Sequence, residues 1–280
     1  MKTLYRAASV ILIAGCWALL TAGGSLNQAN EYSSGQEMVD NDQEMAESDQ
    51  EIEGNTVVFE KIDDLLNQGE NQQAWEILQR LPENGPDSAE RLWRRARVQY
   101  EMGQVAEKKS VKRYKSAEKY ARAAIKNDPN NSESYKWLAI AIGAQSKYSS
   151  TKEQVRQSGE IKKYIEKAIE LNPDDDISYL VLSRWHYKVS ALGGVARTFA
   201  KVIYGGVPKA SLKKAEELLL QAIEIHDRIA HRYNLAKVYK RMDRQEEAME
   251  QLRLTLLLPV TFPEEVSDKE KAKRKQQSWK

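Results

Sequence analysis

Residues with distinctive chemistry are scarce in this 280-residue chain. It contains one cysteine, Cys16, three histidines, 14 glycines and 7 prolines. This composition excludes a disulfide-stabilised scaffold, a cysteine-ligated zinc site and a collagen-like chain. The sequence also lacks a Walker loop, a GxGxxG motif after a strand, an HExxH motif and a GxSxG nucleophile elbow. We therefore expect a non-enzymatic protein with no catalytic residue, no metal site and no cofactor.

Positive charge is missing from one long stretch near the N-terminus. From residue 25 to residue 53, nine side chains are carboxylates and none is Lys or Arg. Since residues 1–24 hold two cations and the whole chain carries +2, residues 54–280 carry +9. Residues 25–55 also have too few branched or aromatic side chains to form a core. We predict an acidic, disordered linker there, attached to a basic body.

The first 24 residues have the pattern of an export signal or anchor. A short basic start, Met1 to Arg6, precedes an apolar run from Ala7 to Leu20 and several small residues. Three interpretations remain open. Ile13-Ala14-Gly15-Cys16 resembles a bacterial lipobox, which makes Cys16 a lipidation candidate. Alternatively, cleavage after Ala22-Gly23-Gly24 releases a soluble protein, or the segment stays uncleaved as an anchor. Each one predicts an exported protein of the cell envelope or periplasm, tethered to a membrane or soluble.

The body is predicted to be all-α from residue 56 to residue 262. Its apolar residues recur three or four positions apart, and no run of alternating β-branched residues appears. Prolines at 86, 129, 173 and 259 divide it at intervals that indicate repeats. We expect five first helices, each followed by a second helix. The first helices are predicted at Val57–Gln68, Ser88–Met102, Ser132–Ala144, Ile177–Ser190 and Ile229–Arg241.

The helix pairs resemble tetratricopeptide repeats, which place small residues where two antiparallel helices cross. The fifth pair carries the matching residues Leu235, Ala236, Tyr239, Ala248, Leu252 and Pro259. In the first two pairs, Ile62 and Arg97 stand where this alignment calls for a small residue. The resemblance implies a right-handed α-solenoid of about five helical hairpins. Units two to four exceed the repeat length of 34 residues by about eight, ten and twenty residues, inserted between their helices.

Several segments between Glu90 and Pro259 make the resemblance more specific. They read LWRRARVQYEMG, SYKWLAIAIG, IKKYIEKAIELNPDD and LSRWHYKVS. With the long inter-helix insertions, they resemble the regulator of microtubule dynamics family, here as an exported, bacterial-type member. That family has tetratricopeptide-like bodies, frequently behind a membrane anchor, and is associated in eukaryotes with microtubules and membranes. An exported protein would meet no microtubule, so the resemblance implies an interaction scaffold without naming its partner.

The first helices of such a solenoid line its concave face, so their register predicts a basic groove with aromatic residues. The groove candidates are Arg94, Arg95, Lys136, Trp137, Arg184, Tyr233, Asn234, Lys237, Lys240 and Arg241. We expect this groove to bind an acidic protein or peptide segment. Solvation of a helical surface is the alternative role for these cations.

Two further segments widen the functional alternatives. Glycine pairs bracket VARTFAKVIY within residues 193–206, which predicts a short apolar helix. With the groove, this insert offers a second hypothesis, a carrier of lipid or of a small anionic ligand. Residues 263–280 form a basic C-terminal helix or tail. Because the chain is predicted to be exported, an anionic membrane surface or a protein partner is favoured for the tail over nucleic acid.

Overall fold

The computed structural model describes residues 56–82, 88–106, 110–205 and 209–279. The predicted leader, Cys16 and the acidic linker lie outside the described residues. The chain divides into two units, and every described residue belongs to the second, Glu53–Lys280. Throughout the described ranges, regular structure is helical and no strand occurs, in agreement with the predicted fold class.

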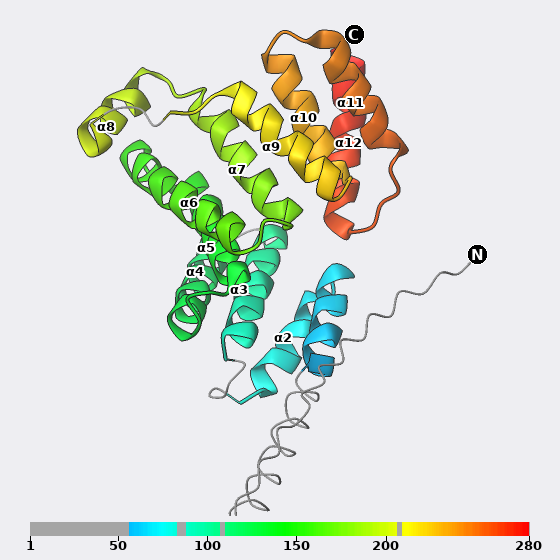
Figure 1. Ribbon diagram of the computed structural model, residues 1–280. Helices are drawn as coiled ribbons and strands as arrows, with labels where there is room; N and C mark the ends of the chain where they lie inside the picture. The colour runs from blue at the N-terminus through cyan, green and yellow to red at the C-terminus, as the bar shows by residue number, and fades with distance from the viewer. Residues whose placement is uncertain (1–55, 83–87, 107–109, 206–208, 280) are drawn as a thin grey trace, which may run out of the picture. The chain divides into compact units, whose positions relative to one another are not determined.

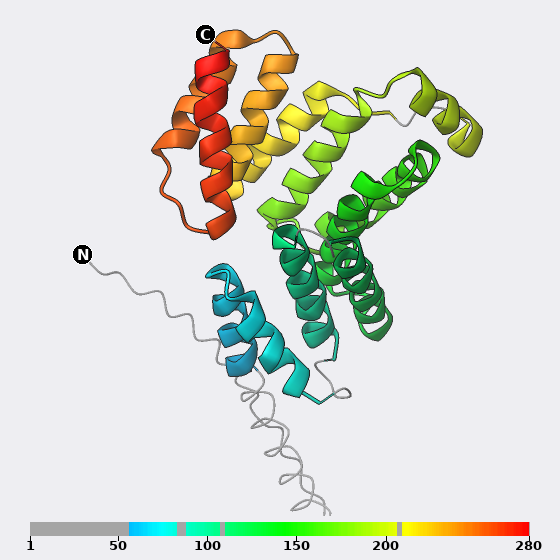
Figure 2. The same ribbon diagram turned by 180° about the vertical axis from the view of Figure 1, so that it is seen from behind.

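Helices follow one another with short connections (Figures 1 and 2). The first occupies residues 56–67. The others are α2 (Asn71–Arg80), α3 (Ser88–Val105), α4 (Ser110–Asn127), α5 (Ser132–Gln145), the 3-10 helix η1 (Ser146–Tyr148), α6 (Thr151–Leu171), α7 (Asp176–Val189), α8 (Gly194–Tyr204), α9 (Leu212–Ile225), α10 (Ile229–Arg241), α11 (Gln245–Leu257) and α12 (Pro263–Ser278).

The helices pack in the order expected of tetratricopeptide-like units. The pairs α3/α4, α5/α6, α7/α9 and α10/α11 are in extensive contact. Each second helix also packs on the first helix of the next pair, as α4 does on α5 and α9 on α10. First helices touch one another as well, α3 against α5 and α7 against α10. The predicted first helices are thus confirmed to within a few residues, and α10 has the predicted bounds.

The core is continuous across neighbouring pairs. One cluster joins Ala139 of α5, Ile165 of α6, Leu182 of α7 and Leu218 of α9. A second joins Leu180, Leu219 and Leu235, from α7, α9 and α10. Because each cluster draws side chains from two pairs, no pair buries its apolar face alone, as in other repeat proteins.

Local sequence signals set the helix starts. The side chains of Asn131, Ser150 and Ser211 accept hydrogen bonds from backbone N–H groups in the first turns of α5, α6 and α9. Such caps satisfy donors that would otherwise lack a partner.

Extra elements occupy the predicted insertions and the C-terminus. The apolar insert forms α8, which packs on α6. In the third pair, the insertion forms η1 and lengthens α6. Residues 263–278 form α12, which packs on α10 and α11 and buries Ala272 completely. The predicted basic C-terminal segment is therefore the helix that covers the end of the array. Among the described residues, no helix has the length and apolar character needed to span a membrane.

Candidate functional site

Three of the cations predicted for the groove are buried in contacts between helix pairs. Arg94 is 7% exposed and pairs with Asp63 of the preceding helix at 2.6 Å and with Glu90 at 2.7 Å. Its guanidinium also lies over the Phe59 and Trp93 rings. Through its ion pair with Asp63 and its contact with the Phe59 ring, Arg94 links the first helix pair to the second.

Arg95 and Lys136 have similar structural contacts. Arg95 donates to the Leu78 carbonyl at the end of α2, at 2.6 Å. Lys136 pairs with Glu133 and, across to the next pair, with Asp175 at 3.2 Å. Burial opposes the charged form of Lys136, but the two carboxylates outweigh it and raise its pKa. All three cations already have partners within the fold, so they are not available to a ligand in the way that an unpaired cation is.

A one-residue difference in register explains why Arg95 is buried, since it takes the position that Leu235 holds in α10. Ala96, not Arg97, is the small residue of α3, and it packs fully buried beside Ala121 of α4. Ala139 and Ala236 hold the same place in α5 and α10. The sequence alignment of the second pair was therefore wrong by one position. Arg97 then corresponds to Lys237, and it pairs with Glu101 at 2.8 Å.

Two predicted cations, Arg184 of α7 and Lys237 of α10, come together. Both donate to the amide oxygen of Asn234, Arg184 at 3.4 Å and Lys237 at 3.2 Å. The ammonium of Lys237 also lies 5.2 Å from the centre of the Tyr187 ring and 5.6 Å from that of Tyr233. The site thus combines unneutralised positive charge with aromatic faces.

Further cations surround this pair. Burial, Arg184, Lys275 and Lys188 together lower the pKa of Lys237 to about 8, against the opposing effect of Asp268. Burial, Lys147 and Arg184 likewise lower the pKa of Lys188. We call these five cations the cationic cluster: Lys147, Arg184, Lys188, Lys237 and Lys275. Within the described part of the chain, none of the five forms an ion pair with a carboxylate.

Two of the remaining predicted groove residues, Lys240 and Arg241, lie beside the cluster. Arg241 donates to the Tyr187 carbonyl at 2.9 Å and lies over its ring. Lys240 donates to Gln245 and lies over the Trp279 ring. Trp137 instead donates to Glu133 in α5 and stacks near Tyr100. The structure therefore gathers the α7 and α10 candidates, whereas those of α3 and α5 have other partners.

The register did not assign Lys147, Lys188 or Lys275 to the groove. Lys147 and Lys275 lie in η1 and α12, outside the repeat pattern, whereas Lys188 lies on α7 one turn after Arg184. One sequence signal for this region exists. Between Asp176 and Glu216, the chain contains seven Lys or Arg residues and no carboxylate.

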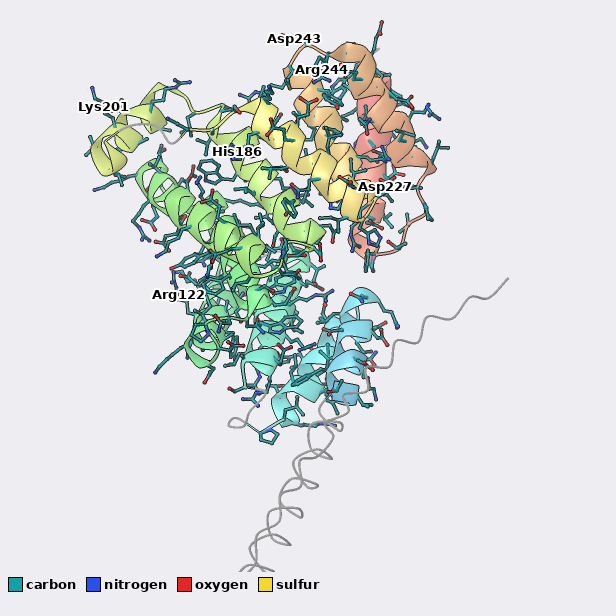
Figure 3. All side chains as sticks on the ribbon, in the orientation of Figure 1. Arg122, His186, Lys201, Asp227, Asp243 and Arg244 are labelled. Carbon is teal, nitrogen blue, oxygen red and sulfur yellow. The ribbon has the colours of Figure 1, made fainter. Side chains whose placement is uncertain are left out.

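Unlike the cations of the cluster, His186 and Arg244 have structural roles (Figure 3). His186 lies edge-on to Trp185 and accepts from the backbone N–H of Ser211 at 3.4 Å. Burial lowers its pKa, so the ring is held neutral. Arg244 pairs with Glu216 at 2.6 Å and thereby ties α11 to α9. Across the described residues, no group of three acidic, histidine or cysteine side chains is arranged to hold a metal ion.

Comparison with known proteins identifies the family. The family model "Regulator of microtubule dynamics protein 1-3" matches residues 58–280. The chain belongs to this family. The match includes the first helix pair and α12, and so exceeds the span that the sequence motifs indicated.

Individual relatives agree with this assignment. Regulator of microtubule dynamics protein 3 of Xenopus laevis is 33% identical over 217 residues, which cover 75% of this chain and 47% of the relative. Regulator of microtubule dynamics protein 1 of Bos taurus is 32% identical over 162 residues, covering 56% and 50%. The chain thus spans about half the length of these curated relatives.

A solved structure supports the fold. A tetratricopeptide-repeat protein of Thermus thermophilus superposes with a TM-score of 0.58 and 18% identity. The match covers 80% of this chain and 97% of that one. At this identity the likeness shows the tetratricopeptide fold alone.

Proposed function

We propose that this chain is a non-enzymatic interaction scaffold whose cationic cluster binds an acidic segment of a partner protein. The observation that carries the proposal is the concentration of cations around Arg184 and Lys237. Burial and then three of these cations lower the pKa of Lys237. Cations held together without carboxylates in ion-pair contact favour an anionic ligand, because the ligand relieves their mutual repulsion. The Tyr187 and Tyr233 rings add apolar area beside the charges.

Tetratricopeptide-like solenoids present long surfaces that suit extended or helical partner segments. The names of the relatives refer to microtubule dynamics, and an acidic segment of a protein that takes part in microtubule dynamics is one such partner. The predicted export of this chain points instead to a partner in the cell envelope.

Charge reversal in the cluster tests the proposal. Arg184→Glu combined with Lys188→Glu should weaken binding of a fluorescein-labelled deca-glutamate peptide by about tenfold or more at low salt, because electrostatic contacts are strongest there. The control combines Lys126→Glu with Lys152→Glu, since both side chains are exposed and lie outside the cluster. Fluorescence anisotropy measures the affinity, and circular dichroism checks the helix content. Equal weakening in the two double variants would show a general charge effect and refute the site.

A second candidate function, a carrier of lipid or of a small anionic ligand, is favoured by α8. This helix leaves Val195 66% and Val202 79% exposed, next to the exposed cations Arg197 and Lys201. Exposed apolar side chains among cations suit an anionic amphiphile. Mass spectrometry of organic extracts from the purified protein tests this function. A stoichiometric lipid would favour the carrier, and a lipid-free protein that binds the peptide would favour the scaffold.

We also propose that residues 1–24 export or tether the protein and that residues 25–55 space the body from the membrane. The basic start, the apolar run and Cys16 support the first role, and the uniform acidic charge supports the second.

A further inference from the structure

The amine of Lys237 lies in surroundings that disfavour its charged form. Its Nζ donates to the amide oxygen of Asn234 at 3.2 Å, and Arg184 donates to the same oxygen at 3.4 Å. The Tyr187 and Tyr233 rings flank the amine, with ring centres 5.2 and 5.6 Å away. Over the described ranges, Lys237 forms no ion pair with a carboxylate. A half-buried ammonium that has a neutral acceptor and a neighbouring guanidinium is less stable than one paired with a carboxylate.

The neutral amine of Lys237 is therefore populated near neutral pH. Burial and the neighbouring cations of the cluster together lower the pKa of Lys237 to about 8, against the opposing effect of Asp268. At pH 7.5, about one molecule in four then carries the neutral amine, compared with about one in a thousand for an ordinary lysine. A neutral amine has a free lone pair and is a nucleophile, whereas an ammonium is not.

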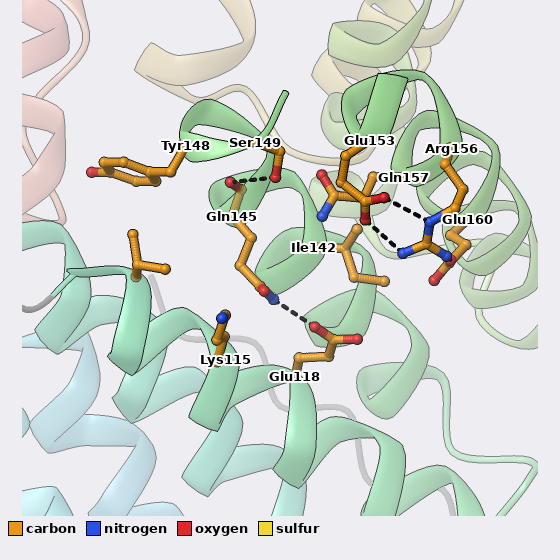
Figure 4. Close-up of a pocket in the computed structure, with 11 residues that line it drawn as sticks. Lys115, Glu118, Ile142, Gln145, Tyr148, Ser149, Glu153, Arg156, Gln157 and Glu160 are labelled. Atoms are coloured by element: carbon orange, nitrogen blue, oxygen red, sulfur yellow. Dashed lines mark hydrogen bonds and ion pairs between the residues drawn. The ribbon is translucent and has the colours of Figure 1, made fainter. Parts of the chain in front are cut away.

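The cations of the cluster differ from those around the cavity of about 310 Å³ that α4, α5 and α6 line (Figure 4). There, Arg156 pairs with Glu153 at 2.6 Å and with Glu160 at 2.5 Å. Arg122 pairs with Glu118 at 2.7 Å and with Glu160 at 3.0 Å. Because the arginines of the cavity already have carboxylates in ion-pair contact, a new anion would be stabilised less there than in the cationic cluster.

We propose that Lys237 is a carbon dioxide site, where the amine forms a carbamate that the neighbouring cations stabilise. The nitrogen lone pair attacks the carbon of carbon dioxide, so that a C–N bond forms and the electrons of one C–O π bond move to oxygen. One proton leaves the nitrogen for water. The carbamate keeps one N–H, which can still donate to Asn234, and its new carboxylate forms beside the guanidinium of Arg184.

Carbon dioxide suits this amine better than an acylating agent does. The molecule is small and uncharged, so it can reach a half-buried nitrogen between two tyrosine rings. Its product is an anion, which the cations of the cluster stabilise by charge. An acyl group would instead leave a neutral amide, which gains no charge stabilisation from Arg184.

The carbamate regulates the scaffold, an inference that rests on the proposed binding of an acidic segment. It turns the charge of the Lys237 side chain from positive to negative and gives Arg184 an anionic partner. Both central cations then become unavailable to the carboxylates of a partner. We therefore expect dissolved carbon dioxide to weaken binding of the deca-glutamate peptide about threefold or more.

Carbamate formation can be measured directly on the full chain at pH 7.5. Carbon-13 nuclear magnetic resonance with labelled bicarbonate and carbon dioxide detects the carbamate carbon. Trapping with triethyloxonium, followed by peptide mass spectrometry, assigns the carbamate to a residue. We expect about tenfold or more carbamate on Lys237 than on Lys214, an exposed lysine of α9 that pairs with Glu217.

Three variants separate the amine from the positive charge. Lys237→Arg should abolish the carbamate assigned to this position, because it keeps the charge and removes the nucleophilic amine. Lys214→Arg is the matched control and should form as much carbamate on Lys237 as the parent chain does. Arg184→Gln should lower the carbamate on Lys237 about threefold or more, because it removes a cation that stabilises the product and disfavours the ammonium. Circular dichroism checks the helix content of each variant.

The proposal is overturned if no carbamate forms on Lys237 or if Lys214 forms as much, even where the peptide binds. If carbamate forms on Lys237 and the peptide never binds, the modification is supported and the scaffold function fails. Where both occur, carbon dioxide should weaken peptide binding in the parent chain and not in Lys237→Arg. Equal weakening by sodium acetate at the same pH and ionic strength would show simple competition by anions and overturn the regulation.

Discussion

The ammonium of Lys237 should make partner binding depend on pH. Its pKa is lowered to about 8 from the ordinary value of 10.5, first by burial and then by Arg184, Lys275 and Lys188. The side chain is therefore charged below about pH 8 and loses its charge as the pH rises through that value. An acidic segment needs the charged form, so binding should weaken across the same range.

The size of the effect follows from the pKa. At pH 9, one unit above a pKa of about 8, about one molecule in ten carries the charge, so a partner that requires it should bind about tenfold more weakly than at pH 6.5. The carboxylates of a deca-glutamate peptide stay ionised over this range. Lys188, whose pKa is also lowered, adds to the decrease.

Lys237→Arg isolates the contribution of this residue, because a guanidinium stays charged at both pH values. Its affinity for the fluorescein-labelled peptide, measured by anisotropy, should change much less with pH than that of the parent chain. Lys214→Arg is the control, since Lys214 is exposed on α9 and pairs with Glu217. If Lys237→Arg and the parent chain lose affinity equally, Lys237 does not contact the partner and the reasoning fails.

Stability provides a second measurement on the same residue. The difference between 10.5 and about 8 corresponds to about 3 kcal/mol against the charged ammonium in the folded state. Removing the Lys237 ammonium should gain less stability than this, because solvent screens the charge and because its contacts with the Tyr187 and Tyr233 rings are lost. Lys237→Met should therefore raise the free energy of unfolding at pH 7 by up to about 2 kcal/mol. In urea denaturation, a loss of more than about 1 kcal/mol would show that the ammonium stabilises the fold.

Three further predictions concern the body and the leader. Arg94→Ala should lower the free energy of unfolding by about 3–5 kcal/mol in urea, because it leaves two carboxylates without their buried partner, whereas Arg253→Ala, at an exposed pair, should cause no measurable change. Gly103→Ala should cost about 1–3 kcal/mol, because its Cβ would lie 2.5 Å from a tyrosine ring of α4. Gly143→Ala has ordinary contacts and should gain about 0.5–1 kcal/mol; equal effects of the two glycine changes would contradict the packing. If Cys16 is lipidated, Cys16→Ser should move the protein from the membrane fraction to the soluble fraction, while an unchanged distribution would favour one of the other two interpretations of the leader.

The sequence alone determined the helices and their pairing. Helical periodicity and capping residues are local, so Ile229–Arg241 could be placed to the residue. The repeated small residues and the prolines then indicated how the pairs stack. The same signals placed Arg184, Asn234 and Lys237 in one predicted groove, and the structure brings these three together.

Only the tertiary structure decided which cations already have partners. Arg94 and Lys136 resemble Lys237 in sequence, but their partners Asp63 and Asp175 lie 31 and 39 residues away along the chain. A one-residue change of register on a helix turns a side chain by about 100°, enough to bury a residue expected in the groove. Periodicity sets which face of a helix is apolar, whereas the partners of its charges depend on contacts between segments that are distant in the sequence.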